Sequence, residues 1–104
     1  MGIYSNGYIF IFFFMSNLRT PKIIKSTPKV KIFIPKGIAK KDLQYELLSL
    51  EEYEVIRLKC TQGLGQIGCA KAMNTSQSTI QRILCSCMKK IGTAIIEGKG
   101  IQIV

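Results

Sequence analysis

Residues 64–100, LGQIGCAKAMNTSQSTIQRILCSCMKKIGTAIIEGKG, contain the pattern that decides the fold. Small side chains in the first part permit close helix contact, and we expect a short helix from Gln66 to Met73. A tight turn over 74–76 follows, in which Ser76 is a natural N-cap for a longer helix from Gln77 to Glu97. Gly98 is its expected C-cap. The longer helix has an apolar stripe with three-and-four spacing: Ile80, Ile83, Leu84, Cys87, Ile91, Ala94 and Ile95.

A short helix, a three-residue turn and a capped second helix are typical of a helix-turn-helix. In that motif the first helix braces the second, whose N-terminal residues contact base edges in the major groove. With the apolar stripe turned inward, the polar side chains of the longer helix point outward or lie on its flanks. We therefore expect DNA contacts from Ser76, Gln77, Ser78, Thr79, Gln81, Arg82 and Lys89. The alternative is an ordinary polar helix start on a small helical protein.

The segments before this motif complete the expected fold. Ser49 and Glu52 form a capping box at the start of another helix, which Gly63 ends. Tyr53, Ile56 and Cys60 make one apolar stripe on that helix. Alternation in KVKIFIPKG predicts a short strand over 30–34, GIQIV at the end is a second strand candidate, and a short helix is expected over 40–48. The expected fold is one mainly α domain, with a tri-helical helix-turn-helix core and a possible small two-stranded β element.

Positive charge is concentrated towards the two ends of the chain. Lys and Arg total 15 against six acids, a formal net charge of +9, and eight cations precede the first acid, Asp42. Such an excess suggests an anionic partner such as nucleic acid or a membrane surface. We interpret residues 15–48 as a basic arm with a short strand and a linker, and 49–104 as the helix-turn-helix domain. Lys22, Lys25 and Lys29 are candidates for phosphate contacts, with a solvated charged tail as the even alternative.

Several functional classes lack support in the sequence. The chain has no His, and the spacing of its four Cys does not suit a structural zinc site, so we expect reduced, partly buried thiols and neither metal nor cofactor. No phosphate loop and no paired carboxylates in a cleft are found, since capping explains Glu51 and Glu52. We therefore expect no enzyme.

From Met15 to the C-terminus the chain resembles a bacterial and archaeal family of small uncharacterised proteins predicted to bind DNA. The helix-turn-helix of that family is similar to the fourth region of bacterial sigma factors. The matching stretches are PKVKIFIPKGI, LSLEEYEVIRL, GLGQIGCAKAM, SQSTIQRIL and KKIGTAIIEGKGIQI. The resemblance implies a cytoplasmic transcriptional regulator with double-stranded DNA as its partner. This chain departs from the family's pattern at Ile67 and Gly68, where acids are usual, and at Gln77, where Arg is usual.

The first residues of the chain stand outside this resemblance. MGIYSNGYIFIFFF, residues 1–14, carries no charge, is too short to span a membrane and lacks the positive start of a secretory signal. Since family members begin much as MSNLRTPK does, we interpret 1–14 as an upstream extension from an early start in gene calling. The alternative is a lineage-specific hydrophobic tail.

The sequence is also compatible with two other functions. One is a sigma-like adaptor that contacts RNA polymerase without reading bases. The other is a membrane-associated protein held by residues 8–15 and the basic arm, although we expect no membrane partner. A homodimer is plausible, because the apolar stripe of the long helix continues past its DNA-reading end.

Overall fold

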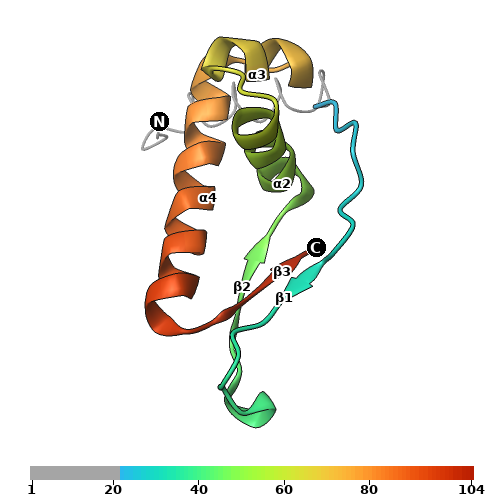
Figure 1. Ribbon diagram of the computed structural model, residues 1–104. Coiled ribbons are helices and arrows are strands. Elements are labelled where there is room, and N and C mark those ends of the chain that lie inside the picture. Colours follow the sequence, from blue (N-terminus) through green and yellow to red (C-terminus); the bar gives the residue numbers. More distant parts are fainter. Residues whose placement is uncertain (1–21) are drawn as a thin grey trace, which may run out of the picture.

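The computed structural model describes residues 22–104 (Figure 1). The predictions for residues 1–14 and for the start of the arm lie outside the described residues. The elements follow in this order: β1 (Ile32–Phe33), the 3-10 turn η1 (Lys40–Asp42), β2 (Tyr45–Leu48), α2 (Leu50–Ile56), the π-helical turn η2 (Arg57–Thr61), α3 (Gln66–Met73), α4 (Gln77–Glu97) and β3 (Gly100–Ile103). No helix in the described range is both long and apolar enough to cross a membrane.

The molecule combines its helices with a small sheet, so the expectation of a mainly α fold is supported. α4 runs from α3 at one end to the sheet at the other (Figure 1). The sheet has three strands in the order β1-β3-β2, where β3 is antiparallel to β1 and parallel to β2. The expected two-stranded element is therefore wrong by one strand. The central strand is β3, the last element of the chain. Its pairing with β1 and β2 links the segment 49–104 to the segment before the boundary expected at 48/49.

The extra strand is β2, which forms within the segment 40–48, where a short helix was expected. Only Lys40–Asp42 is helical there, while Tyr45–Leu48 pairs with Gly100–Ile103 residue by residue. Leu48 and Ile103 are opposite each other in this ladder and both are buried. Burial of this pair favours the strand, because a strand places alternate side chains on one face of the sheet.

The helix after Ser49 begins as expected and packs in part as expected. The Ser49 Oγ accepts from the Glu52 N–H at 3.1 Å, and a Glu52 carboxylate oxygen accepts from the Ser49 N–H at 2.8 Å, which confirms the capping box. The α-helix ends at Ile56 and continues as a π-helical turn. The expected stripe is confirmed in part: Tyr53 and Ile56 are half-buried and pack against a core cluster, whereas Cys60 is exposed. The fully buried positions are Glu52, Glu54, Val55 and Leu58.

The bounds predicted for α3 and α4 are confirmed. Asn74 ends α3 in the left-handed region at φ 57°, a conformation that Asn tolerates better than most residues. Ser76 caps the start of α4, and Gly98 ends it at φ 69°. Of the predicted stripe, Ile80, Cys87 and Ala94 are buried, but Ile95 is 72% exposed and does not belong to the core.

The core consists of two clusters that α4 connects. One holds Val55, Leu58, Cys69, Ala70, Met73 and Ile80, and lies among α2, η2, α3 and the start of α4. The other holds Leu48, Cys87 and Ile103, and lies between α4 and the sheet. Cys69 and Cys87 are thus core residues, whereas Cys60 and Cys85 are exposed thiols.

The described part of the basic arm packs along the helices. The Ile23 N–H donates to the Met73 carbonyl at the end of α3, at 2.9 Å. The Lys25 N–H and the Ser26 hydroxyl donate to the Glu54 carboxylate at 3.2 Å and 2.7 Å. These bonds and strand β1 make residues 22–34 part of the fold, so this stretch differs from the solvated tail that was one alternative.

Candidate nucleic-acid interface

The start of α4 is held in a defined geometry by its cap. The Ser76 Oγ accepts from the Thr79 N–H at 3.2 Å, and the Ser76 and Thr79 hydroxyls lie 2.9 Å apart. The Ser78 hydroxyl lies 3.1 Å from the same oxygen. A capped start fixes which side chains of the first turns point outward.

The outward-facing residues largely match the sequence prediction. Gln77, Ser78, Gln81, Arg82 and Lys89 are exposed. Thr79 is the exception, since it is only 6% exposed and its hydroxyl bonds the cap. One step along a helix is a rotation of about 100°, which places Thr79 beside the buried Ile80 and away from the surface. Thr79 is therefore a structural residue of the cap.

A glutamine on α3 organises this surface, and the sequence prediction missed it. The Gln66 Oε1 accepts from the Gln77 Nε2 at 3.3 Å, and the Gln66 Nε2 donates to the Gln81 Oε1. The Gln81 Nε2 in turn lies 3.6 Å from the Cys85 Sγ. Gln66 thus holds two expected base-contacting amides in position. Gln66 is 11 and 15 residues from Gln77 and Gln81 in the sequence and lies on another helix, so no local sequence pattern indicates this contact.

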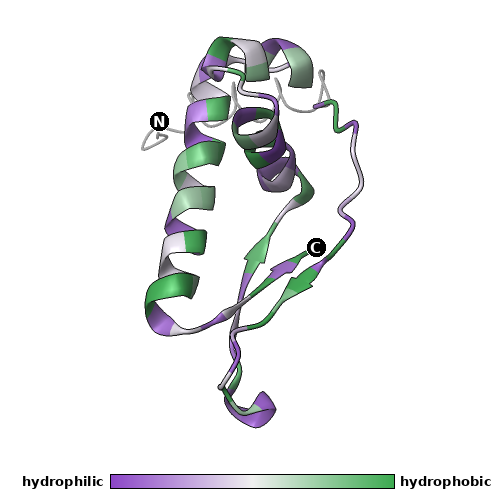
Figure 2. Cartoon of the chain, viewed as in Figure 1, coloured by the Kyte–Doolittle hydropathy of each residue, from purple (hydrophilic) through white to green (hydrophobic). Residues whose placement is uncertain are grey.

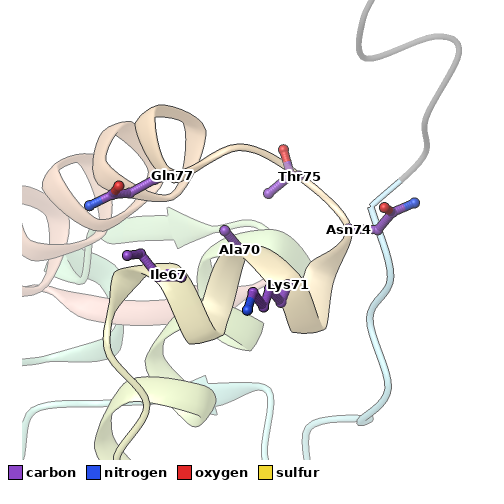
Figure 3. A pocket seen from close by; sticks show the side chains of 6 residues that line it. All are labelled: Ile67, Ala70, Lys71, Asn74, Thr75 and Gln77. Atoms are coloured by element: carbon purple, nitrogen blue, oxygen red, sulfur yellow. The ribbon is translucent and has the colours of Figure 1, made fainter.

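The turn between α3 and α4 borders an open hollow of about 540 Å³ (Figure 3). Ile67 and Ala70 of α3 lie on its apolar side, and Lys71, Asn74 and Thr75 supply the polar groups. Gln77, at the start of α4, is the sixth lining residue. The hollow is therefore continuous with the capped end of α4.

The acidic side chains of α2 are paired with cations, so they do not offset the other cations of this surface. Glu51, Glu52 and Glu54 pair with Lys22, Lys90 and Arg57 at 3.4, 2.9 and 2.8 Å. Residues 55–96, which include all of α3 and nearly all of α4, contain no Asp or Glu. The surface formed by α3, the turn and the start of α4 is consequently cationic and polar.

Glu52 connects the capping box of α2 to α4. Its carboxylate accepts from the Ser86 hydroxyl at 2.7 Å and from the Lys90 ammonium at 2.9 Å. Burial alone would raise the pKa of Glu52, but the bonds from the Ser49 N–H, Ser86 and Lys90 outweigh it and hold the pKa below its ordinary value. An ionised Glu52 therefore connects the start of α2 to Ser86 and Lys90 of α4.

The arm cations differ in their surroundings: one is mostly buried and paired, and two are exposed. The Lys22 side chain is only 10% exposed and its ammonium pairs with Glu51, so this predicted phosphate contact has a structural partner. Lys25 and Lys29 are exposed. Among residues 22–104, no three His, Cys, Asp or Glu side chains gather as a metal site would require.

The fold and this surface define a small, basic, mainly α domain whose exposed helix start carries hydrogen-bonding amides. The chain belongs to the family described as "Protein of unknown function DUF134", which matches residues 14–104. Membership of an uncharacterised family, as predicted, is thus confirmed, and the description of the family states no function.

Bacterial relatives called UPF0251 proteins agree with this assignment. The chain is 42% identical over 79 residues to one from Halothermothrix orenii, 76% of this chain and 58% of that relative. It is 41% identical over 80 residues to one from Caldanaerobacter subterraneus, 77% of this chain and 68% of the relative. A Thermoanaerobacter pseudethanolicus protein is 39% identical over 87 residues, 82% and 74% of the two chains. No solved structure shows a significant match.

Proposed function

We propose that this protein is a cytoplasmic transcriptional regulator that binds double-stranded DNA sequence-specifically. In this proposal α3 and α4 act as a helix-turn-helix similar to that of sigma region 4. The observation that carries the proposal is the capped start of α4, where four exposed hydrogen-bonding side chains stand on a surface without acids: Gln77, Ser78, Gln81 and Arg82.

The residue types suit base edges in the major groove. A glutamine amide can pair with adenine through two hydrogen bonds, and an arginine can bind guanine or a phosphate. Gln66 bonds both Gln77 and Gln81, which reduces the side-chain freedom that binding would otherwise remove. α3 supports the reader from behind, since Cys69, Ala70 and Met73 pack with Ile80 in one core cluster.

The charge distribution favours a polyanion as the partner. Between residues 55 and 96 the chain carries six cations and no acid. Arg57 and Lys90 pair with Glu54 and Glu52, and the other four are Lys59, Lys71, Arg82 and Lys89. Lys71 borders the hollow beside the turn, where a backbone phosphate would lie if α4 entered the groove. Cationic side chains that displace counterions from phosphates supply affinity without reading sequence.

The arm supports the same surface from one side. Ile23 is bonded to the end of α3, so this part of the arm lies next to the turn between α3 and α4. The exposed Lys25 and Lys29 follow on that path and are proposed as phosphate contacts. Lys22 is left with the structural role that its pairing with Glu51 gives it.

The experiment is selection of bound sequences from random double-stranded DNA, followed by affinity measurements at several salt concentrations. We expect one enriched sequence, bound about a thousandfold or more tightly than scrambled DNA, and an affinity that falls linearly with the logarithm of salt concentration. If no sequence is enriched and the salt dependence is absent, the adaptor that contacts RNA polymerase without reading bases becomes the better hypothesis.

A further inference from the structure

The proposed DNA-reading surface is formed by α3, the turn after it and the start of α4. The rest of α4, away from that surface, carries exposed apolar side chains. Ile95 and Ile96, in its last turn, are 72% and 84% exposed, and Met88 two turns earlier is 61% exposed. Phe33 and Ile34, at the end of β1, are 53% and 60% exposed. Figure 2 colours β1 and parts of this last stretch of α4 as hydrophobic. We call Phe33, Ile34, Met88, Ile95 and Ile96 the tail patch.

A groove of about 240 Å³ lies within this patch. Phe33, Ile34 and Pro35 line one side, and Ala94, Ile95 and Ile101 line much of the rest. Phe33 is opposite Ile101 in the β1–β3 ladder, so both side chains are on the sheet face that α4 covers. The ammonium of Lys99, also at the groove, is held by Glu46 at 3.1 Å and Glu97 at 3.2 Å. The groove is therefore apolar, with its charge paired.

The area of the patch is at the upper end of what a typical monomer exposes. Taking about 200 Å² for each large side chain, the five exposed fractions amount to on the order of 600 Å² of apolar surface. The largest apolar patch of a typical monomer is about 300–600 Å², and it is often functional. A stable dimer buries about 800 Å² on each partner, of which about two-thirds is apolar in homodimers. The tail patch supplies that apolar share.

We propose that the tail patch binds a second copy of this chain in a two-fold symmetric dimer. Such an interface requires that one patch carry both a projecting group and a recess for it. Ile96 projects from the same last turn of α4 whose residues Ala94 and Ile95 line the groove. Ile96 of each copy would then enter the groove of the other, and the paired Lys99 would lie at the rim.

The dimer leaves the reading surface open. Gln77 is nineteen residues before Ile96 on α4, which corresponds to about 28 Å along the helix axis. The dimer does not depend on the proposed function. What does depend on the proposed function is the consequence for DNA: two α4 helices related by a two-fold axis would select a palindromic sequence.

Sedimentation equilibrium of the full chain without DNA, over a wide concentration range, tests the proposal. We expect a species of twice the 11.7 kDa chain mass. Ile96→Glu and Ile34→Glu should each raise the dimer dissociation constant by about 30-fold or more, because each places a carboxylate in the desolvated centre of the contact. Ile67→Glu, an exposed isoleucine on α3 outside the patch, is the matched control and should leave dissociation unchanged.

Circular dichroism of each variant verifies that it folds, as expected for exposed positions. A monomeric parent chain throughout the range would overturn the proposal, as would equal weakening by the Ile67 variant. Growth beyond the dimer mass without a plateau would overturn the closed two-fold contact. If the chain is monomeric but binds anionic vesicles through Ile96, the patch is a membrane contact instead. A stable dimer that fails to bind DNA would contradict the proposed function and leave this inference intact.

Discussion

Glu54 is a buried carboxylate that joins the arm to the helical core. Its side chain is 1% exposed and accepts from the Arg57 guanidinium at 2.8 Å and 3.1 Å. The Ser26 hydroxyl and the Lys25 N–H complete its shell. The bonds from Arg57, against the opposing effect of burial and with the help of Ser26 and Lys25, lower the pKa of Glu54 from 4.5 to about 2. The carboxylate therefore stabilises the fold only in its ionised form.

The pH dependence of stability should report this residue. A folded-state pKa below the unfolded value stabilises the fold above pH 4.5, and the contribution is lost as the pH falls from 4.5 towards 2. The shift corresponds to about 3 kcal/mol at neutral pH. Glu54→Gln should lower the free energy of unfolding by about 2–3 kcal/mol at pH 7, and the gap to the parent should narrow in acid, as measured by urea denaturation across this range.

Glu97→Gln is the matched control for this measurement. The Glu97 side chain is 57% exposed and pairs with Lys99 at the surface, so its loss should cost less than about 1 kcal/mol. A gap between Glu54→Gln and the parent that stays constant from neutral pH to pH 2 would contradict the assigned role of the Glu54 charge.

At the scale of elements, two glycines of α4 should respond in opposite directions to the same substitution. Gly98 ends the helix at φ 69°, where an added Cβ is strained, so Gly98→Ala should cost about 1 kcal/mol. Gly92 lies inside the helix, and a Cβ there would meet no atom within 4 Å. Gly92→Ala should therefore stabilise by up to about 1 kcal/mol through helix propensity. Thermal or chemical unfolding of both variants tests the pair, and a change of the same sign in both would refute it.

The proposed contribution of α4 to base recognition can be separated from its contribution to stability. Gln77→Ala or Gln81→Ala should leave folding nearly intact and relax discrimination at one base position by about 1–3 kcal/mol. Ser76→Ala is the contrasting variant, since loss of the cap should cost about 1 kcal/mol of stability while specificity is kept in the folded fraction. Competition binding with selected and scrambled DNA measures the ratio. An unchanged ratio in both glutamine variants would remove α4 as the reader.

The elements that could be predicted from the sequence are those with local start and stop signals. Ser49 with Glu52, Ser76 and Gly98 each mark a helix end within a few residues, and these ends lie where expected. β2 could not be predicted, because its pairing partner β3 is more than fifty residues further along the chain. The contact of Gln66 with Gln77 and Gln81 is likewise tertiary, and no spacing rule within one helix points to it.

At the scale of the whole molecule, buried carboxylates determine where the positive charge is available. Glu52 and Glu54 each take up a cation inside the fold, at Lys90 and Arg57. The burial of two acidic side chains on α2 was not predictable, because their partners Ser26, Ser86 and Lys90 lie far along the chain. The consequence is that Lys90 and Arg57 are engaged inside the fold, and a polyanion on the surface around α3 and the start of α4 would meet other cations, such as Lys71 and Arg82.

The arm is the part of this surface whose proposed contribution to DNA binding can be isolated. If the exposed Lys25 and Lys29 contact phosphates, replacing both with Ala should weaken binding to selected and scrambled DNA alike. The slope of log affinity against log salt should flatten by about two, roughly one for each lost contact. Lys22→Ala should act on stability instead, because its ammonium pairs with Glu51.

The double variant Lys40→Ala and Lys41→Ala is the control, since it removes the same charge from η1, at the end of the molecule opposite α3 (Figure 1). Long-range attraction to DNA depends on net charge and would change equally in both double variants, whereas a direct contact depends on position. A slope that flattens to the same extent in the two variants would therefore show that the arm acts only through its charge. A slope that changes with Lys25 and Lys29 alone would place the DNA backbone against the arm.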